Sequence, residues 1–309
     1  METLLFLVGA TASGKTATAL EIARRMPVEL ISLDSMNVYR GMDIGTAKPT
    51  SAEREAVPHH LVDVVDPDGS FSVGDYVRAA EEAVAGIRSR GKRPLFMGGT
   101  PLYLKAMTAG LFAGPPADRA YRRGLHERAE REGVEALHAE LARVDPSAAA
   151  RIHPNDLKRI VRGLEVHHKT GRPISELQTE WSSPSAKRPS RIAGIAWDRQ
   201  ALYGRIELRV DRMFAGGLVE EVRGLVARYG RLGRGASQAL GYREVLAHLA
   251  GKTDLAETIA LVKRNTRRMA KRQLTWFRSF GQIRWFEMTE TTSTAGLATS
   301  IAAWYEQCD

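Results

Sequence analysis

Cysteine is almost absent from this chain of 309 residues, and its single instance, Cys308, stands next to the C-terminal end. One thiol excludes an internal disulfide framework and a zinc site built from several cysteines. Long apolar runs are also missing, since the run Leu4 to Val8 is too short to span a bilayer and follows the acidic Glu2 instead of a basic segment. We therefore expect a cytoplasmic protein with no membrane anchor and no secretion signal.

Acidic residues are absent between Thr258 and Phe286. The same segment is strongly basic and contains Lys263, Arg264, Arg267, Arg268, Lys271, Arg272, Arg278 and Arg284. Residues 191–309 carry 19 basic and 12 acidic side chains, whereas residues 1–110 carry 12 and 13. Several of the basic residues recur four positions apart on one predicted helix, where like charges repel unless phosphates neutralise them. The pattern favours a nucleic-acid-binding surface over a solvated face, with chemistry in a separate region.

Three aromatic residues lie near the end of this segment, namely Trp276, Phe277 and Phe280. Their rings either stack on bases or pack the helix onto the core, and we expect core packing for most of them. A second basic cluster contains Lys158, Arg159 and Arg162. It begins a predicted helix with Asn155 or Asp156 as the cap. Two basic surfaces in different parts of the chain are suited to hold one polyanion from two sides.

Short apolar runs alternate with helical stretches and predict an α/β fold. The predicted strands are Leu4–Val8, Val28–Leu33, Leu61–Val65, Pro94–Met97 and Arg191–Trp197. Helices are predicted at Thr16–Arg25, Val73–Arg90, Leu202–Tyr229 and Leu255–Phe280, and a further strand at Ile283–Met288. Buried strands that alternate with helices indicate a parallel sheet covered on both faces.

About ninety residues separate the fourth predicted strand from the fifth, which indicates an insertion. From Ala117 to about Thr179 the periodicity is helical, and a Pro/Ser-rich connector, Ser182–Ser190, follows. The predicted domains are residues 1–115, the first part of a P-loop core; residues 116–188, a helical insertion that carries the second basic cluster; and residues 189–309, the second part of the core with long basic helices.

The pattern G-x-x-x-x-G-K-[ST] occurs once, between a predicted strand and a helix. Its residues are Gly9, Ala10, Thr11, Ala12, Ser13, Gly14, Lys15 and Thr16. The glycines let the backbone wrap an anion, the lysine neutralises outer oxygens, and the Thr16 hydroxyl is placed to hold Mg²⁺. The motif predicts a di- or triphosphate ligand and leaves three reactions open: ATP hydrolysis, phosphoryl transfer, or departure of pyrophosphate from carbon. The absence of an Asn-Lys-x-Asp motif argues against a GTPase.

Polar side chains follow the second and fourth predicted strands, at the edge where open α/β sheets bind ligands. Asp34 follows the second strand, and three roles suit it equally: magnesium ligand, helix cap, or general base. Thr100 follows Gly98 and Gly99, and it is either a turn residue or a substrate contact.

Several segments together resemble the bacterial tRNA dimethylallyltransferase family, also called tRNA isopentenyltransferases or IPP transferases. These segments are the P-loop, Asp34–Pro49, Gly98–Tyr103, Arg151–Asp156, Gly241–Arg243 and Lys271–Arg278. The run Asp34–Pro49 is far more specific than a P-loop. The resemblance covers nearly the whole chain.

The resemblance implies a P-loop NTPase-like parallel sheet with a helical insertion. It implies transfer of a dimethylallyl group from dimethylallyl diphosphate to the exocyclic amine of the adenine 3′ of the anticodon, in tRNAs that read codons beginning with U. The P-loop would hold the diphosphate with Mg²⁺, and the target base would be flipped into a channel. By the same similarity Asp34 is the general base, while Lys15, Thr100 and Arg205 act near the diphosphate. We expect a monomer.

The resemblance also implies which residues contact the anticodon stem-loop of tRNA. They are Asp34, Ser35, Met36, Asn37, Thr100, Arg122, Lys158, Arg159, Ile160, Val161, Arg162, Gln238, Ala239, Leu240, Gly241, Tyr242, Arg243, Lys271, Arg272, Gln273, Leu274, Thr275, Trp276, Phe277 and Arg278.

Two rival functions fit part of the sequence. An adenylate isopentenyltransferase or a small-molecule P-loop kinase would explain the P-loop and Asp34 but not the basic helix. A non-catalytic RNA-binding NTPase switch would explain the charge, and it would require RNA affinity that depends on ATP.

Overall fold

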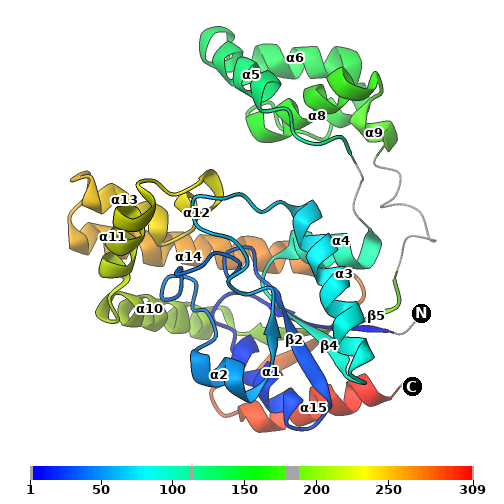
Figure 1. Ribbon diagram of the computed structural model, residues 1–309, viewed down its shortest axis with the longest axis vertical. Coiled ribbons are helices and arrows are strands. Elements are labelled where there is room, and N and C mark those ends of the chain that lie inside the picture. Colours follow the sequence, from blue (N-terminus) through cyan, green and yellow to red (C-terminus); the bar gives the residue numbers. More distant parts are fainter. Residues whose placement is uncertain (1–2, 111–113, 178–187, 308–309) are drawn as a thin grey trace. The chain divides into compact units, whose positions relative to one another are not determined.

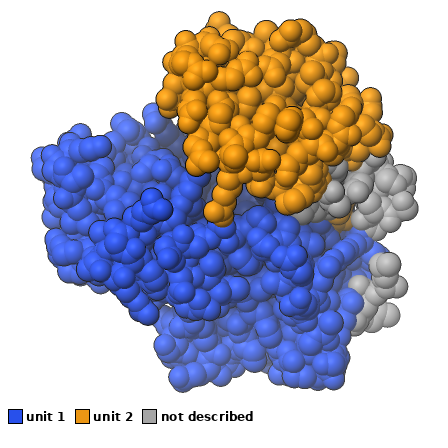
Figure 2. All heavy atoms as spheres, turned by 45° about the horizontal axis from the view of Figure 1, so that its top comes forward, with its two compact units in different colours: residues 1–107, 188–309 blue, residues 108–187 orange. Residues whose placement is uncertain are grey.

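The computed structural model describes residues 3–110, 114–177 and 188–307. The chain divides into two compact units, which Figure 2 shows in different colours. Unit 1 comprises residues 1–107 and 188–309, and unit 2 comprises residues 108–187. Cys308 and most of the predicted connector Ser182–Ser190 lie outside the described residues. No described helix is long and apolar enough to cross a membrane.

Unit 1 is built on a parallel sheet whose strand order is β3-β2-β4-β1-β5-β6 (Figure 1). The strands are β1 (Leu4–Gly9), β2 (Val28–Leu33), β3 (His59–His60), β4 (Arg93–Gly98), β5 (Ser190–Trp197) and β6 (Ile283–Met288). The strand β1 lies between β4 and β5 and is buried along its whole length. This explains its continuous apolar sequence, because a central strand of a covered parallel sheet has no solvent face.

Helices cover both faces of the sheet. The helices of unit 1 are α1 (Lys15–Ala23), α2 (Ser51–Ala56), α3 (Val73–Ser89), α4 (Pro101–Ala109), α10 (Arg199–Ala215), α11 (Leu218–Tyr229), α12 (Arg234–Ser237), α13 (Tyr242–Leu249), α14 (Leu255–Arg278) and α15 (Thr294–Glu306). Of these, α11, α12 and α13 pack in a separate cluster with the loop that follows β2. Leu5 and Leu7 of β1 pack in one core cluster with α1 and α15. Leu4, Phe6 and Val8 pack in another with α3, α4 and Phe277 of α14, so alternate residues of one strand serve opposite faces. The predicted α/β fold class is confirmed.

One predicted strand is wrong. The segment Leu61–Val65 is not a strand, and β3 consists only of His59–His60. Leu61 and Asp63 adopt φ values of 61° and 56°, in the left-handed region that extended backbone never visits. The Asp63 carboxylate turns toward Lys48 and Arg54, and Val65 keeps a single parallel bridge to Tyr39. The chain therefore leaves the sheet two residues after it enters.

The predicted single helix Leu202–Tyr229 is two helices. The helix α10 begins earlier, at Arg199, because Asp198 accepts hydrogen bonds from Gln200 N and Ala201 N and caps it. It ends at Ala215, and Gly217 at φ 95° separates it from α11. Apolar periodicity continues across this break, which is why the pattern suggested one helix.

Unit 2 is helical throughout its described part. It contains α5 (Arg119–Glu132), α6 (Val134–Val144), α7 (Pro146–Ala149), α8 (Leu157–Thr170) and α9 (Ile174–Leu177). These helices enclose a core that includes Leu125, Leu137, Leu141 and Leu164. A Cβ on Gly163 would lie 2.7 Å from Leu141 Cδ1, so this glycine allows α6 and α8 to pack closely.

The unit begins at Thr108, before the predicted start at residue 116. Hydrogen bonds join Pro115 and Asp118 to α8. Arg162 Nη1 donates to the Pro115 carbonyl at 3.1 Å, and the Asp118 N–H donates to Glu165 Oε1 at 2.7 Å. Residues 114–118, which have no regular secondary structure, are thereby part of the same compact body.

Candidate active site of unit 1

The P-loop closes tightly between β1 and α1. Gly14 has φ 92° and Ala12 has φ 63°, so two residues of the turn are left-handed. A Cβ on Gly9 would lie 2.8 Å from Ser13 Oγ and 3.1 Å from the Ile195 carbonyl. Glycine is required at both ends of the turn, for close approach at Gly9 and for conformation at Gly14. The first turn of α1 then presents backbone N–H groups, the donors that bind anions at helix N-termini.

Lys15 lies in an unusual electrostatic environment. Its ammonium donates to the Ala10 carbonyl at 2.7 Å, and the side chain is half-buried. Burial lowers the pKa of Lys15 to about 7; the neighbouring Arg209 guanidinium acts in the same direction, and the Asp34 carboxylate opposes both. Lys15, Arg209 and Asp34 therefore share one local field beside the P-loop.

Two arginines of α10 hold the outer side of the P-loop. Arg205 Nε donates to the Ala12 carbonyl at 2.9 Å, and its guanidinium lies 4.3 Å from the centre of the Trp197 ring. Trp197 in turn donates from Nε1 to the Ser13 carbonyl at 2.9 Å. Arg209 Nη1 donates to Thr11 Oγ1 at 3.2 Å.

Arg209 is a site residue that the sequence analysis missed. Burial lowers the pKa of its guanidinium, and the Asp34 carboxylate partly offsets that effect. A signal was present, because Arg205 and Arg209 are four residues apart and so lie on one face of a helix. Because resemblance assigns Arg205 to the site, this spacing predicts that Arg209 lies there as well.

Asp34 and Thr100 lie at the ends of the neighbouring strands β2 and β4. Asp34 Oδ1 accepts the Met36 N–H at 2.8 Å and closes a turn. The next helix, α2, begins only at Ser51, so the helix-capping role considered for Asp34 is wrong. Thr100 Oγ1 accepts the Ser35 N–H at 3.1 Å, and Thr100 N donates to the Leu33 carbonyl at 3.1 Å. Thr100 thus fixes the turn that carries Asp34.

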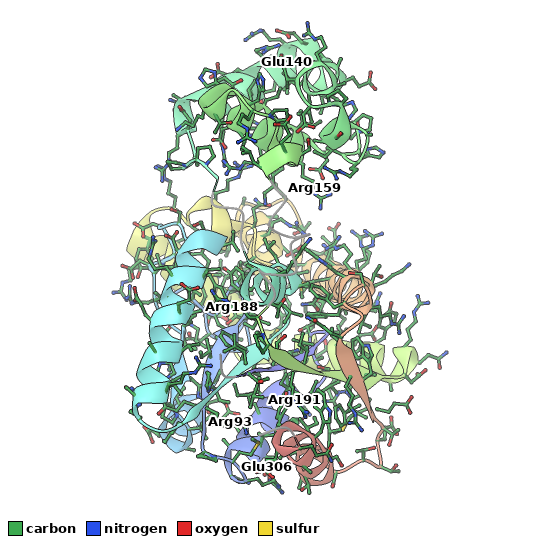
Figure 3. The ribbon with its side chains drawn as sticks, turned by 90° about the vertical axis from the view of Figure 1, so that its right-hand side faces the viewer. Arg93, Glu140, Arg159, Arg188, Arg191 and Glu306 are labelled. Atoms are coloured by element: carbon green, nitrogen blue, oxygen red, sulfur yellow. The ribbon has the colours of Figure 1, made fainter. Side chains whose placement is uncertain are left out.

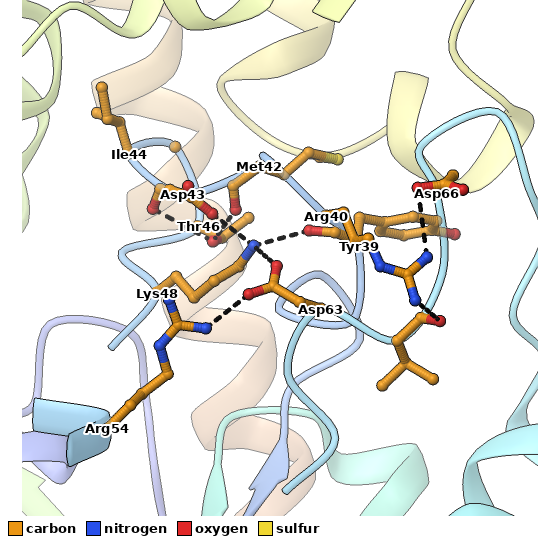
Figure 4. Close-up of polar contacts among 12 residues, drawn as sticks. Tyr39, Arg40, Met42, Asp43, Ile44, Thr46, Lys48, Arg54, Asp63 and Asp66 are labelled. Atoms are coloured by element: carbon orange, nitrogen blue, oxygen red, sulfur yellow. Dashed lines mark hydrogen bonds and ion pairs between the residues drawn. The ribbon is translucent and has the colours of Figure 1, made fainter. Parts of the chain in front are cut away.

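The loop that follows Asp34 is held by a buried cation, Lys48 (Figure 4). Its ammonium donates to the Tyr39 carbonyl at 2.7 Å and to Asp43 and Asp63 at 2.6 Å each. Arg54 also pairs with Asp63, at 2.6 Å. Removing a buried partner of this kind leaves an uncompensated charge, so the cluster keeps the loop in one conformation.

A second anchor joins the same loop to α11 and α13. Glu221 accepts the N–H groups of Asp43 at 3.0 Å and Ile44 at 2.7 Å, and the Tyr242 hydroxyl at 2.5 Å. A Cβ on Gly45 would lie 2.4 Å from the Tyr242 ring, so only glycine fits there. The specific run Asp34–Pro49 therefore owes much of its sequence to shaping one loop beside Asp34.

The basic residues of α14 fall into two groups. Lys263 and Arg267 pair with Asp211 and Glu207 of α10, so their charges are neutralised within unit 1. Within residues 3–110, 114–177 and 188–307, no acidic partner is found for five exposed residues: Arg264, Arg268, Lys271, Arg272 and Arg278. Figure 3 shows nitrogen-tipped side chains projecting from this orange helix. The exposed group is called the outer basic face below.

The aromatic residues of α14 also divide. Phe277 and Phe280 pack in the core, as expected for most of the three, whereas Trp276 is 39% exposed. Trp276 lines an open hollow along α14 together with Arg268, Lys271, Arg272, Thr275 and Ser279. An exposed ring beside cations is the arrangement that stacks on a base.

Other residues assigned to tRNA by resemblance are buried. The buried residues of this set are Asn37, Ile160, Val161, Ala239, Gly241, Tyr242 and Phe277. In residues 158–162 and 238–243, the exposed side chains are Lys158, Arg159, Gln238 and Arg243. Arg159 lies at the surface of unit 2 (Figure 3). Only the exposed members have a side chain accessible from solvent.

Arg122 and Arg162 have an internal partner. Both pair with Glu165, at 2.7 Å and 2.5 Å, and that carboxylate is fully buried in unit 2. Burial raises the pKa of Glu165, but the two arginines outweigh it and hold that pKa below its usual range. These arginines stabilise the fold of unit 2, and their charge is largely compensated.

The described residues contain no group of three or more His, Cys, Asp or Glu side chains that could hold a metal. The Thr16 hydroxyl points at the weak acceptor Met97 Sδ at 3.9 Å, which leaves its lone pairs available to a cation. A cation here would take most of its ligands from phosphate and water, as is usual for Mg²⁺.

The match to the family described as IPP transferase spans residues 37–280. The chain belongs to the IPP transferase family. Among relatives, it is 52% identical to the tRNA dimethylallyltransferase of Geobacter metallireducens over 286 residues, 92% of each chain. It is 44% identical to that of Geobacillus kaustophilus, over 97% of this chain and 95% of the other.

Solved structures of IPP transferases share this fold. The full-length tRNA isopentenylpyrophosphate transferase from Bacillus halodurans superposes with a TM-score of 0.73 at 42% identity, covering 99% of this chain and 96% of that one. A eukaryotic dimethylallyltransferase acting on tRNA gives 0.83 at 27% identity, over 98% and 78%. The P-loop precedes the range matched by the family, so it is separate evidence for the site.

Proposed function

We propose that this protein transfers a dimethylallyl group from dimethylallyl diphosphate to the exocyclic amine of the adenine 3′ of the anticodon, in tRNAs that read codons beginning with U. The observation that carries the proposal is the shared field of Lys15, Arg209 and Asp34 beside the P-loop. Two cations suit a leaving diphosphate, and one carboxylate suits the proton that the amine releases. Membership of the IPP transferase family supports the same reaction.

Departure of the diphosphate is the step that the cations assist. The amine nitrogen forms a bond to C1 of the dimethylallyl group while the bond from C1 to the diphosphate oxygen breaks. The electron pair of that bond goes to the diphosphate, so negative charge grows there. Lys15, Arg205, Arg209 and the N–H groups of the first turn of α1 are already fixed around this position, which lowers the cost of reorganisation.

The proton leaves from the nitrogen. An adenine amine is a poor base and nucleophile, but its N–H becomes acidic once the nitrogen bonds to carbon. Asp34 takes that proton, since its turn and the Thr100 hydroxyl hold it at the sheet edge beside the P-loop. Thr100 acts by positioning that turn. The products are prenylated adenine, diphosphate and a protonated carboxyl group.

Mg²⁺ fits the site as a partner of the Thr16 hydroxyl and the diphosphate oxygens. When bound, it would supply further positive charge to the leaving group. Lys15 and Arg209 would share that task, so part of the stabilisation belongs to the protein alone.

The tRNA would lie on the outer basic face, with Trp276 available for stacking. Extracting a base from its stack costs a few kcal/mol, and less in a single-stranded loop than in a duplex. We further propose that the protein acts as a monomer in the cytoplasm.

Incubation with radiolabelled dimethylallyl diphosphate tests the function directly. Each reaction contains tRNA, AMP, or tRNA lacking the target adenine. We expect label only in the intact tRNA. Label in AMP would support an adenylate isopentenyltransferase, and ATP-dependent RNA affinity without any transfer would support an NTPase switch.

A further inference from the structure

Gln273 connects the P-loop to the turn after β4. The Thr11 N–H donates to Gln273 Oε1 at 2.9 Å, and Gln273 Nε2 donates to the Gly99 carbonyl at 2.7 Å. Both ends of the amide are thus used by backbone groups of the two turns that flank the site. The donor and the acceptor come from segments far apart in sequence, at residues 11 and 99, and Gln273 on α14 joins them.

Gln273 lies on the inward face of α14. Ala270 and Phe277 are three and four residues away on the same side of the helix, and both are buried in the core. Ala270 and Leu274 pack in one cluster with Ala10 and Ala12 of the P-loop. The neighbouring Lys271 and Arg272 are exposed on the other side. One helix therefore carries the outer basic face on one side and touches the P-loop with the other.

Two further features show that the amide fits tightly. A Cβ on Gly99 would lie 2.7 Å from Gln273 Nε2, so the glycine makes room for the amide. Thr11 also accepts a hydrogen bond at its hydroxyl, from Arg209 Nη1. Gln273 on α14 and Arg209 on α10 together fix Thr11, the second variable residue of the P-loop.

We propose that Gln273 is a positioning residue for the diphosphate and not a tRNA contact. It fixes the P-loop against the turn that carries Thr100, so that the anion-binding N–H groups and the Asp34 turn keep a constant separation. The resemblance assigns Gln273 to tRNA as one member of the run Lys271–Arg278, but its polar atoms are already paired inside unit 1. The inference rests on the proposed function for the identity of the diphosphate.

The test compares two adjacent residues, Gln273 and Arg272. Affinity for pyrophosphate with Mg²⁺ is measured by calorimetry, and affinity for an anticodon stem-loop RNA is measured separately without diphosphate. Because two hydrogen bonds are lost, we expect Gln273→Ala to weaken pyrophosphate binding about tenfold and to leave RNA affinity within about twofold. Arg272→Ala should do the reverse, weakening RNA binding alone.

Two more variants separate hydrogen bonding from packing. Gln273→Met keeps the length of the side chain and loses both bonds, so it should behave like Gln273→Ala. Gly99→Ala displaces the amide from the opposite side without changing α14, and it should weaken pyrophosphate binding in the same direction. Thermal unfolding of each variant confirms that it folds. In transfer assays, Gln273→Met should raise KM for dimethylallyl diphosphate and leave KM for tRNA unchanged.

Three results would overturn the inference: reduced RNA affinity in Gln273→Ala with pyrophosphate binding unchanged, no change in either affinity, or wild-type pyrophosphate binding by Gln273→Met. Transfer by the wild-type protein is measured in parallel. If the wild type transfers the prenyl group but any of these results is found, only the role of Gln273 fails. If the wild type transfers nothing to tRNA while pyrophosphate binding responds to Gln273, only the proposed function fails.

Discussion

The P-loop region and the outer basic face use the same residue types in opposite ways. Beside the P-loop, Lys15 and Arg209 are half-buried, carry lowered pKa values and donate to fixed partners. On α14, Arg264, Arg268 and Arg272 are exposed and lack an acidic partner among the described residues. A fixed, desolvated cation suits charge concentrated on one diphosphate, whereas mobile exposed cations suit charge spread along a backbone. Basic composition alone did not distinguish these environments.

The largest effect is expected at the Asp34 carboxylate, which lies near Lys15 and Arg209. Asp34→Asn retains an oxygen for the Met36 N–H and so preserves the turn, but it removes the proton acceptor. Prenyl transfer should fall by a factor of about a hundred or more, with RNA affinity nearly unchanged. Single-turnover transfer and RNA binding, measured side by side, check this. Unaltered turnover would remove the general-base role.

The outer basic face should dominate the salt dependence. Replacing Arg264, Arg268, Arg272 and Arg278 together by Ala removes four unpaired charges. If each contacts a phosphate, the slope of log affinity against log salt should decrease by about three. The matched control replaces Lys263 and Arg267, which are paired with α10. An equal change of slope in the control would show that internal pairing does not exclude RNA contact.

Unit 2 offers an intermediate case, where arginines are paired with a buried acid. Glu165→Gln should destabilise unit 2 by about 2 kcal/mol, after allowance for the partial exposure of Arg122 and Arg162. The pKa of Glu165 is lower in the folded state, so its contribution is present at neutral pH and is lost as pH falls through the acid range. Thermal unfolding of both proteins at pH 7 and pH 4 should show a difference that shrinks on acidification. A constant difference would contradict the ionic role.

The smallest expected effect is the uptake of a proton by Lys15 when pyrophosphate binds. Because the pKa of Lys15 is about 7, much of the free protein carries a neutral amine at pH 8, and a bound diphosphate favours the charged form. Pyrophosphate binding at pH 8 should therefore take up a fraction of a proton, seen as a heat that varies with the ionisation enthalpy of the buffer. Lys15→Arg should abolish this uptake, because its guanidinium stays protonated. Buffer-independent heats in the wild type would rule the mechanism out.

Much of the fold followed from local pattern. The strands β1, β2, β4, β5 and β6 were predicted because each is a short apolar run bounded by turn or helix signals. The prediction of a strand at Leu61–Val65 was wrong because Leu61 and Asp63 adopt left-handed backbone, and Asp63 pairs with Lys48 and Arg54, which no local pattern reveals. The helix α15 was not predicted at all. Its apolar residues lack a clear periodic pattern, and contacts with α1 define its buried face.

The residues of the candidate site also fall into two groups, those that the sequence predicts and those that only tertiary packing reveals. The P-loop residues were predicted by spacing, because one continuous turn carries the chemistry. Asp34 was located by strand position, but its role came from resemblance. Arg209 and the contacts of Gln273 depend on how α10 and α14 pack against the P-loop, so they required three dimensions.

The central place of β1 has a consequence for biosynthesis. Its partner β5 is translated only after the whole of unit 2, so the emerging chain holds β1 with one edge unpaired while about ninety further residues leave the ribosome. Unit 2, whose helices contact near neighbours in sequence, can fold during that interval. The sheet cannot be completed until β5 has been synthesised. An unpaired central strand is a template for aggregation. The insertion therefore lengthens the interval in which β1 of a nascent chain has an unpaired edge.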